Sequence, residues 1–255
     1  MIKKHVITCT IILTLLVMAK VFAYHLPQAE KVLVRQEKIV PVTITPPKEK
    51  EPVSLMAQLT FADETLPQDD RRVEKKMKKS LRNFSYAKQQ TNRLHRKAAE
   101  WFPVIEPILK QYGIPEDFKY MPLVESGVRG GVSPKGAAGY WQFMPGTARS
   151  YGLKVNAKVD ERNNLRKSTI AASKYIKELY SIFGNWTLVA AAYNVGDNHM
   201  RKQIRKQKED DYFKMKLNRE TAGYVYKLIS MKQIMENPGR YGYTAPRELI
   251  AMNAE

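Results

Sequence analysis

The sequence predicts a mainly α-helical protein, and three observations support this class. Apolar residues recur at spacings of three and four, as in Val73, Met77 and Leu81. Glycine and proline fall between such stretches, where helices stop or start. No alternating run of apolar and polar residues is long enough to compete as a strand. With 255 residues, the chain is long enough for one domain with appendages.

The N-terminus has the pattern of a secretory signal. Residues 1–5 are basic, residues 6–19 are apolar, and the small residue Ala23 offers a cleavage position. The apolar run is shorter than the ~20 residues that a membrane span needs. We therefore expect residues 1–23 to be a signal peptide or, if uncleaved, a membrane anchor, with the rest exported to the periplasm or cell envelope. The one cysteine, Cys9, lies in this segment, so the chain cannot form an internal disulfide.

Residues 24–70 are poor in helix signals. Several prolines interrupt them, and charged residues alternate with valine and isoleucine. Such a composition favours an extended or disordered tether. A small strand-bearing module is the alternative.

Residues 71–100 are expected to form a basic helical extension. One helix face is apolar, with Val73, Met77, Leu81 and Phe84. The opposite face, called here the Lys-rich face, carries Lys75, Lys76, Lys78, Lys79 and Arg82. One interpretation is a solvated face on a helix that packs against the main domain. The other is a contact with an anionic wall polymer or a membrane surface.

Residues 101–243 are expected to form the main helical domain, followed by a tail, residues 244–255. The first helix, residues 101–112, is predicted to start around Pro103 and to stop at Gly113. Residues 126–139, rich in glycine and serine, are expected to form a loop. The other predicted helices are a segment from Pro115 to Glu125, one between Pro145 and Gly152, and residues 165–183, 186–193, 197–206 and 219–236.

One carboxylate, Glu125, stands in unusual surroundings. It follows the apolar residues Met121, Leu123 and Val124, and its helix opens at Pro115 with acidic residues in the first turn. We expect Glu125 near the end of a mostly buried helix, facing a cleft. Burial disfavours a charged carboxylate, so its pKa should rise from ~4.3 toward ~6, which suits a general acid. A solvated surface glutamate is the ordinary alternative.

The motifs that follow Glu125 favour the catalytic interpretation. After Glu125-Ser126, residues 133–148 read SPKGAAGYWQFMPGTA and residues 191–196 read AAYNVG. A late Glu220-Thr221-x-x-Tyr224-Val225 motif follows. This ordered set resembles the catalytic domain of soluble lytic transglycosylases, glycoside hydrolase family 23, and most of all its membrane-bound murein transglycosylase D type. The resemblance covers about residues 101–243. The loop between Glu125 and Ser133 is one residue shorter than the family pattern.

The resemblance implies a lysozyme-like fold and a peptidoglycan lytic transglycosylase that uses no cofactor and no metal. In that chemistry one carboxylate, here Glu125, protonates the glycosidic oxygen between N-acetylmuramic acid and N-acetylglucosamine. It then acts as base on the muramic 6-hydroxyl, which attacks its own anomeric carbon and leaves a 1,6-anhydromuramic end. The residues assigned to substrate binding by the resemblance are Ser126, Ser133, Trp141, Gln142, Met144, Tyr193, Asn194 and Tyr224.

Some of these residues also have plain structural interpretations. Trp141 and Met144 suit a core as well as a pyranose face. Asn194 is placed to cap a helix end before Gly196. Glu220 is the best second carboxylate, yet an acidic residue at a helix N-terminus is favoured by the helix dipole alone.

The charge of the chain favours an anionic partner. The net charge is +18, and a basic surface attracts polyanions such as acidic wall polymers. Neither zinc-ligand spacing nor an RNA-binding signature is present, so nucleic acid is not expected. The four histidines are far apart in sequence, so no metal site is expected. Peptidoglycan strands, with carboxylates on their peptide stems, fit this charge.

Two other functions stay open. A hydrolase of the same fold, like goose-type lysozyme, needs a second carboxylate to position water opposite Glu125. The candidates are Asp160, Glu161, Asp197 and Glu220. A non-catalytic wall-binding or assembly protein would instead use the basic helices as its working surface.

Overall fold

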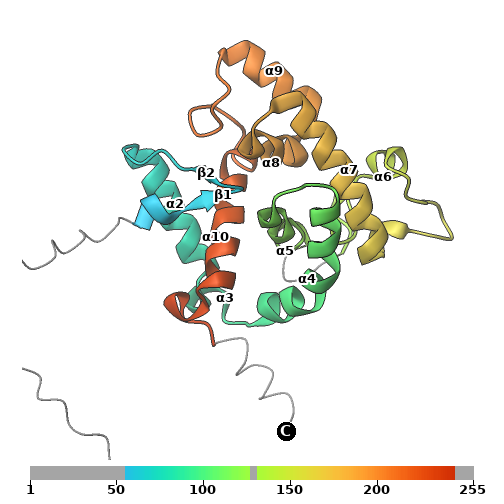
Figure 1. Ribbon diagram of the computed structural model, residues 1–255, viewed down its shortest axis with the longest axis horizontal. Coiled ribbons are helices and arrows are strands. Elements are labelled where there is room, and N and C mark those ends of the chain that lie inside the picture. Colours follow the sequence, from blue (N-terminus) through green and yellow to red (C-terminus); the bar gives the residue numbers. More distant parts are fainter. Residues whose placement is uncertain (1–54, 127–130, 245–255) are drawn as a thin grey trace, which may run out of the picture. The chain divides into compact units, whose positions relative to one another are not determined.

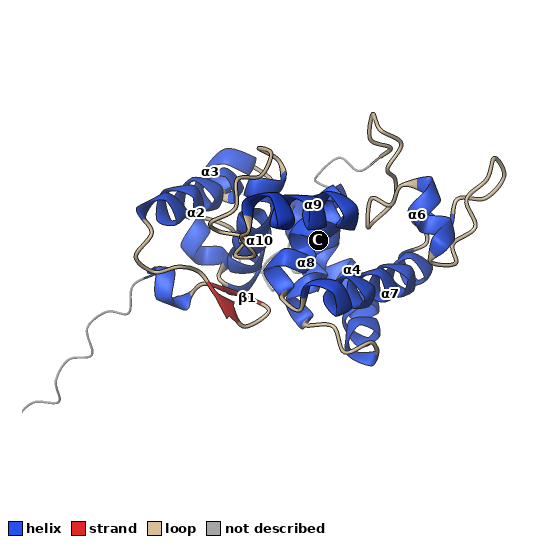
Figure 2. Cartoon of the chain, turned by 90° about the horizontal axis from the view of Figure 1, so that it is seen from above, coloured by secondary structure: helices blue, strands red, loops and turns tan. Residues whose placement is uncertain are grey.

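A computed structural model describes residues 55–126 and 131–244 (Figure 1). The predicted helical class is confirmed. The α-helices are α2 (Arg71–Phe84), α3 (Tyr86–Gln89), α4 (Arg93–Gln111), α5 (Met121–Ser126), α6 (Pro145–Ser150), α7 (Leu165–Phe183), α8 (Trp186–Val195), α9 (Asp197–Gln207) and α10 (Tyr224–Glu236). Short 3-10 helices are η1 (Leu55–Gln58), η2 (Glu116–Tyr120), η3 (Glu161–Asn163), η4 (Thr221–Gly223) and η5 (Pro238–Tyr241). The described strands, β1 (Thr60–Phe61) and β2 (Glu64–Thr65), form one small hairpin (Figure 2).

Helix ends coincide with local capping residues. The Asn164 side chain accepts a hydrogen bond from the Lys167 N–H at 2.9 Å and begins α7, which ends at Gly184 in the left-handed region (φ 63°). The bounds predicted for this helix, residues 165–183, are confirmed. Asn185 caps α8 in the same way, through the Leu188 N–H at 2.9 Å.

The core gathers around α8 and α10. Ala190, Ala191 and Ala192 of α8 are fully buried. Their small side chains let α7 and α10 pack closely against this helix. On its other side α10 packs against α2, as Figure 1 shows. Figure 1 also shows α5 beside α10, which it contacts. Helices α5 and α8, which carry Glu125, Tyr193 and Asn194, therefore both lie beside α10, which carries Tyr224.

The segment predicted as a basic extension packs onto this core. Val73, Met77 and Leu81 of α2 are buried against α10, and the residues of the Lys-rich face are exposed. The apolar spacing of three and four is thus confirmed as the packing face. Among the residues described, none of the helices is long and apolar enough to cross a membrane.

The boundary predicted near Pro103 is wrong. α4 runs without interruption from Arg93 to Gln111 and contains both Pro103 and Pro107. The two prolines are exposed, while Trp101 and Ile105 are buried on the opposite face. A proline in a helix removes one hydrogen bond. Packing of the continuous apolar face outweighs that loss, so the division between residues 100 and 101 falls within one helix.

The prediction of an extended or disordered tether is also wrong for residues 55–70. Leu59 and Phe61 are fully buried, and Leu66 nearly so. Thr60 pairs with Thr65 and Phe61 with Glu64 in the hairpin. Its two turn residues, Ala62 and Asp63, have positive φ angles of 52° and 63°, which match the twist of a tight hairpin. The strand-bearing alternative therefore fits these residues. Residues 1–54 and 245–255, including the predicted signal, the rest of the tether and nearly all of the tail, lie outside the described residues.

Candidate active site

Glu125 lies in the last turn of α5, directly after a buried stretch. Met121 and Leu123 have no exposed surface, and Glu125 itself is partly buried. Burial raises the pKa of Glu125 to about 7, against the opposing effects of a hydrogen bond from Tyr224 and the charge of Lys227. The upward shift of the Glu125 pKa, predicted from its apolar neighbours, is confirmed. The predicted cleft stays a prediction, because residues 127–130 beside Glu125 are not described.

Two tyrosines, the buried Tyr224 and the partly buried Tyr193, approach the same carboxylate. The Tyr224 hydroxyl, at the start of α10, donates a hydrogen bond to Glu125 Oε1. The Tyr193 hydroxyl, near the end of α8, donates to the carbonyl of Trp141 at 2.9 Å. Burial and then the charge of Glu125 raise the pKa of both tyrosines well above the usual value. Both hydroxyls are therefore neutral donors at neutral pH, and the structure brings Tyr193, Tyr224 and Glu125 together.

Trp141 does not have the predicted role. Its side chain is fully buried, and the indole N–H donates to Thr169 Oγ1 at 3.0 Å. A side chain without exposed surface cannot lie against a sugar ring, so its assignment to substrate binding is wrong. Trp141 acts in the core, and its backbone carbonyl receives the Tyr193 hydroxyl.

In the loop before α6, the Gln142 side chain is bonded within the loop, whereas the Met144 side chain is exposed. Gln142 adopts a left-handed backbone (φ 46°), and its Nε2 donates to the carbonyls of Gly139 at 2.9 Å and Gly131 at 3.1 Å. Its amide therefore closes the loop in this structure. Met144 precedes α6 and is 44% exposed. Of the two side chains, Met144 is the one free to meet a ligand.

The two predicted serines bond locally. Ser126 Oγ donates to the Pro122 carbonyl at 2.7 Å, within α5. Ser133 Oγ accepts the Ala137 N–H at 2.9 Å and closes a turn. Their predicted role in substrate binding stays a prediction, because both hydroxyl groups are engaged in these local bonds.

Asn194 connects α8 to the segment before α10. Its Oδ1 accepts the Thr221 hydroxyl at 2.9 Å, and its Nδ2 donates to Glu220 Oε1 at 3.3 Å. Its side chain is therefore directed to η4 and not to the end of its own helix. Glu220 is exposed, and its negative charge contributes to the raised pKa of Glu125.

The other three candidate second carboxylates are engaged with cations. Asp160 pairs with Arg162 at 2.6 Å, Glu161 with Lys167 at 2.6 Å, and Asp197 with Arg201 at 3.9 Å. Glu220 is therefore the best placed of the four. Across the described residues, no group of three histidine, cysteine or acidic side chains could hold a metal ion.

Arg162 is a site-supporting residue that sequence reasoning missed. It is buried, and its guanidinium donates to the carbonyls of Phe143 at 2.9 Å and Gly136 at 2.8 Å. Asp160 balances its charge. Arg162 thereby fixes both ends of the loop that carries Gln142. The only sequence signal is an Asp-x-Arg spacing, which is equally typical of an exposed ion pair.

Comparison with known proteins adds three similarities. Residues 103–216 match the family model described as Transglycosylase SLT domain. Over 187 residues the chain is 35% identical to membrane-bound lytic murein transglycosylase D of Escherichia coli strain K12, and equally to that of Escherichia coli strain CFT073. These alignments cover 71% of this chain and 40% of each relative, so the chain spans about two fifths of their length. Among solved structures, an inactive mutant of lytic transglycosylase Slt from Pseudomonas aeruginosa matches 72% of this chain and 32% of its own, with a TM-score of 0.42 and 20% identity.

Proposed function

We propose that this chain is a peptidoglycan lytic transglycosylase, because residues 103–216 match the family model of the transglycosylase SLT domain. The observation that carries the proposal is Glu125, a partly buried carboxyl whose pKa is raised to about 7 and which accepts a hydrogen bond from Tyr224. Such a group holds its proton near neutral pH and releases it readily, as a general acid must. The curated relatives named above are lytic murein transglycosylases, which supports the same substrate class.

The proposed reaction uses Glu125 twice. Protonated Glu125 donates its proton to the glycosidic oxygen as the bond from the muramic C1 to that oxygen breaks. The muramic 6-hydroxyl oxygen then forms a bond to the same C1, and its proton passes to the Glu125 carboxylate. The acid is restored, the product has a 1,6-anhydro ring, and no water is consumed. Attack from within one sugar also avoids the entropy cost of holding a second reactant.

Tyr224 has a defined part in this cycle. Its hydrogen bond favours the charged form of Glu125 and so opposes the effect of burial. A carboxyl of intermediate pKa can serve as acid in the first step and as base in the second. We propose that Tyr193 and Asn194 bind the sugar beside Glu125, and that Met144 packs on a pyranose face. Ser126, Ser133 and Gln142 would join them only by exchanging their present local bonds for bonds to substrate.

The second candidate function is a hydrolase like goose-type lysozyme, and the position of Glu220 supports it. Glu220 lies close enough for its charge to act on Glu125, and it is exposed. It could therefore activate a water molecule as a second carboxylate. Its bond to Asn194 equally fits a purely supporting role.

For partners and location we propose the cell wall. The relatives are named membrane-bound, and residues 1–23 have a signal or anchor pattern, so we place the protein in the envelope, facing the periplasm. The Lys-rich face of α2 is exposed and is proposed to contact an anionic wall polymer or membrane surface.

Digestion of purified peptidoglycan tests the proposal. A protein beginning near Tyr24 and its Glu125→Gln variant are incubated with sacculi, and the released muropeptides are weighed. We expect products lighter by one water than simple hydrolysis fragments, absent with the variant. Reducing-end products would favour the hydrolase, and binding without any products would favour a non-catalytic wall protein.

A further inference from the structure

The hairpin formed by β1 and β2 lies outside the matched SLT domain. It nevertheless contacts α8 and α10, which carry Tyr193, Asn194 and Tyr224, and η2, which leads into the helix of Glu125. We propose that this hairpin, Thr60–Thr65, is a positioning clasp for the active site, with Glu64 as its principal positioning residue. The inference rests on the proposed function, because it concerns the positions of the candidate site residues relative to one another. These residues are Glu125, Tyr193, Asn194 and Tyr224.

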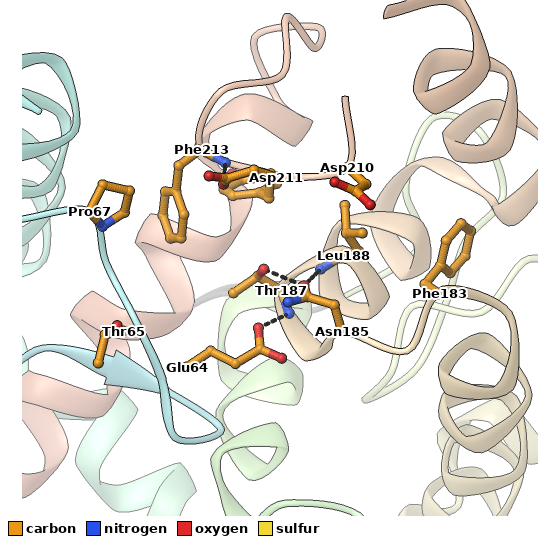
Figure 3. Close-up of a pocket in the computed structure, with 11 residues that line it drawn as sticks. Glu64, Thr65, Pro67, Phe183, Asn185, Thr187, Leu188, Asp210, Asp211 and Phe213 are labelled. Atoms are coloured by element: carbon orange, nitrogen blue, oxygen red, sulfur yellow. Dashed lines mark hydrogen bonds between the residues drawn. The ribbon is translucent and has the colours of Figure 1, made fainter. Parts of the chain in front are cut away.

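The first contact is with α8. Glu64 Oε1 accepts the Trp186 N–H at 2.5 Å, and Oε2 accepts the Thr187 N–H at 2.9 Å. Figure 3 shows the Glu64 carboxylate directed at the start of this helix, where Asn185 receives the next N–H. The first N–H groups of a helix have no partner within it and carry partial positive charge. One carboxylate from the hairpin thus fixes the N-terminus of the helix that ends with Tyr193 and Asn194.

The second contact is with the segment that leads to Glu125. Asp117 Oδ2 accepts the N–H of Ala62 at 2.7 Å, at the turn of the hairpin. Phe61 packs on Phe118 with ring centroids 5.1 Å apart, and Phe118 packs on Trp186 at 5.3 Å. These rings join the hairpin, η2 and the start of α8. Since η2 continues directly into α5, a shift of the hairpin is transmitted toward Glu125.

The third contact is with α10. Lys232 Nζ donates to Asp117 Oδ2 at 2.7 Å and to Thr60 Oγ1 at 3.4 Å. Both side chains of the Lys232–Asp117 ion pair are mostly buried, with 15% and 14% exposed. Lys232 lies on the same helix as Tyr224, two turns away. The hairpin therefore links η2, α8 and α10 at points remote from the reacting atoms.

The surroundings of Glu64 make the clasp testable without unfolding the protein. A cavity of about 370 Å³ opens beside Glu64 and is lined by Thr187, Leu188 and Phe213 among others (Figure 3). If Glu64 is shortened, water can enter and bond to the freed N–H groups of Trp186 and Thr187. The core residue Phe61 and the Lys232–Asp117 pair stay in place. The expected effect is a looser α8, not loss of the fold.

The experiment compares Glu64→Ala and Glu64→Gln with Asp70→Ala in the full chain. Asp70 is a matched control, because its carboxylate also accepts two backbone N–H groups at a helix start, those of Arg72 and Val73 in α2. For each protein, kcat, KM and Tm are measured on soluble peptidoglycan fragments well below the unfolding temperature. We expect kcat to fall roughly tenfold in Glu64→Ala, as for other small misplacements of reacting groups, with KM nearly unchanged.

Glu64→Gln, which keeps one acceptor oxygen, is expected to recover part of the lost kcat. Asp70→Ala should lower Tm by a similar amount and leave kcat unchanged. If Glu64→Ala keeps the wild-type kcat while its Tm falls like that of the control, Glu64 is only a helix cap and the clasp is refuted. If the wild-type protein itself releases no anhydro product, the proposed function fails and the clasp with it.

Discussion

Burial and the Tyr224 hydroxyl have the two largest of the opposing effects on the protonation of Glu125. The apolar residues around it raise its pKa, and the hydroxyl of Tyr224 lowers it. The balance at about 7 leaves the carboxyl able to give and take a proton near neutral pH. In the proposed acid–base cycle, Tyr224 therefore keeps the pKa of Glu125 lower than burial alone would set it.

Replacing Tyr224 by phenylalanine should move the pH dependence of turnover. Wild-type kcat is expected to fall as pH rises through about 7, because Glu125 must be protonated to act as acid. Without the Tyr224 hydrogen bond the charged form of Glu125 is less stable, so the pKa of Glu125 rises. The decrease of kcat with pH should then occur at a higher pH. The overall rate drops by roughly 10- to 100-fold.

Tyr226→Phe is the matched control for that measurement. Tyr226 lies two residues further along α10, and its buried hydroxyl has no hydrogen-bond partner among the described residues. Its removal should leave the pH profile unchanged. A pH profile of Tyr224→Phe that coincides with the wild type would contradict the assigned role of Tyr224.

Glu125 should also make stability depend on pH. Its folded pKa is about 7 against an ordinary value of 4.5, so between these values the folded protein keeps a proton that the unfolded chain has lost. Stability contributed by this group is therefore full below pH 4.5 and declines as pH rises to 7. Glu125→Gln carries no charge and should be more stable than wild type by about 3 kcal/mol at pH 8, with almost no difference at pH 4. Thermal unfolding at the two pH values checks this, and equal Tm values at pH 8 would show that Glu125 is solvated.

Residues with a chemical motif could be predicted, and residues with a packing role could not. Glu125, Tyr193 and Tyr224 are in motifs, and the structure brings them together. Trp141 is in a motif as well, but it is buried and its indole N–H donates to Thr169, 28 residues away, which the motif does not reveal. Arg162 has no motif, because its function arises from carbonyls that only the folded loop presents.

At the scale of elements, the loop before α6 depends on close backbone packing. Gly139 has φ +78°, and a Cβ there would lie 1.9 Å from the Arg162 carbonyl oxygen. The backbones of the loop and of η3 therefore touch at this glycine, and Arg162 then bonds across the same contact.

Gly139→Ala should destabilise the fold strongly. A side chain would separate the loop from η3 and break the bonds of Arg162, at a cost of more than about 3 kcal/mol. Gly136→Ala is the matched control: its φ is also positive, +87°, but open space surrounds the added Cβ. It should cost about 1 kcal/mol. Urea unfolding measures the free energy of unfolding of both variants. An equal decrease in the two would mean that the loop can move away from η3.

Elements with local end signals were predictable, and elements fixed by distant contacts were not. α7 has its asparagine cap and its terminal glycine in the adjacent sequence, and its bounds were predicted correctly. α4 continues through Pro103 because its other face is buried, which no local signal reveals. The hairpin at residues 60–65 is ordered by bonds to Asp117 and to the start of α8, both far away in sequence.

At the scale of the whole molecule, charge is the dominant feature. The chain carries +18, and the Lys-rich face of α2 presents part of this charge to solvent because its apolar face is occupied by α10. Exposed charges act over about 10 Å at ordinary salt and less at higher salt. Binding to the wall should therefore be sensitive to ionic strength.

Reversing the charge of Lys75, Lys79 and Arg82 to glutamate should weaken binding to whole sacculi and reduce its dependence on salt. The kcat on short soluble fragments should not change, because this face is built from residues outside the candidate site. A control that reverses Arg166, Lys174 and Lys177, exposed on α7, changes the net charge by the same amount and so separates the effect of this surface from that of net charge. Sedimentation with sacculi at low and high salt measures the effect, and equal losses in both variants would remove the special role of α2.

The central claim is that Glu125 directs the attack of the substrate's own hydroxyl and not of water. Turnover of peptidoglycan in heavy-oxygen water tests this most directly, with the products analysed by mass. The account predicts anhydromuramic ends that contain no heavy oxygen. Heavy oxygen at the new muramic C1 would contradict it and show that water attacks, with Glu220 as the first carboxylate to examine.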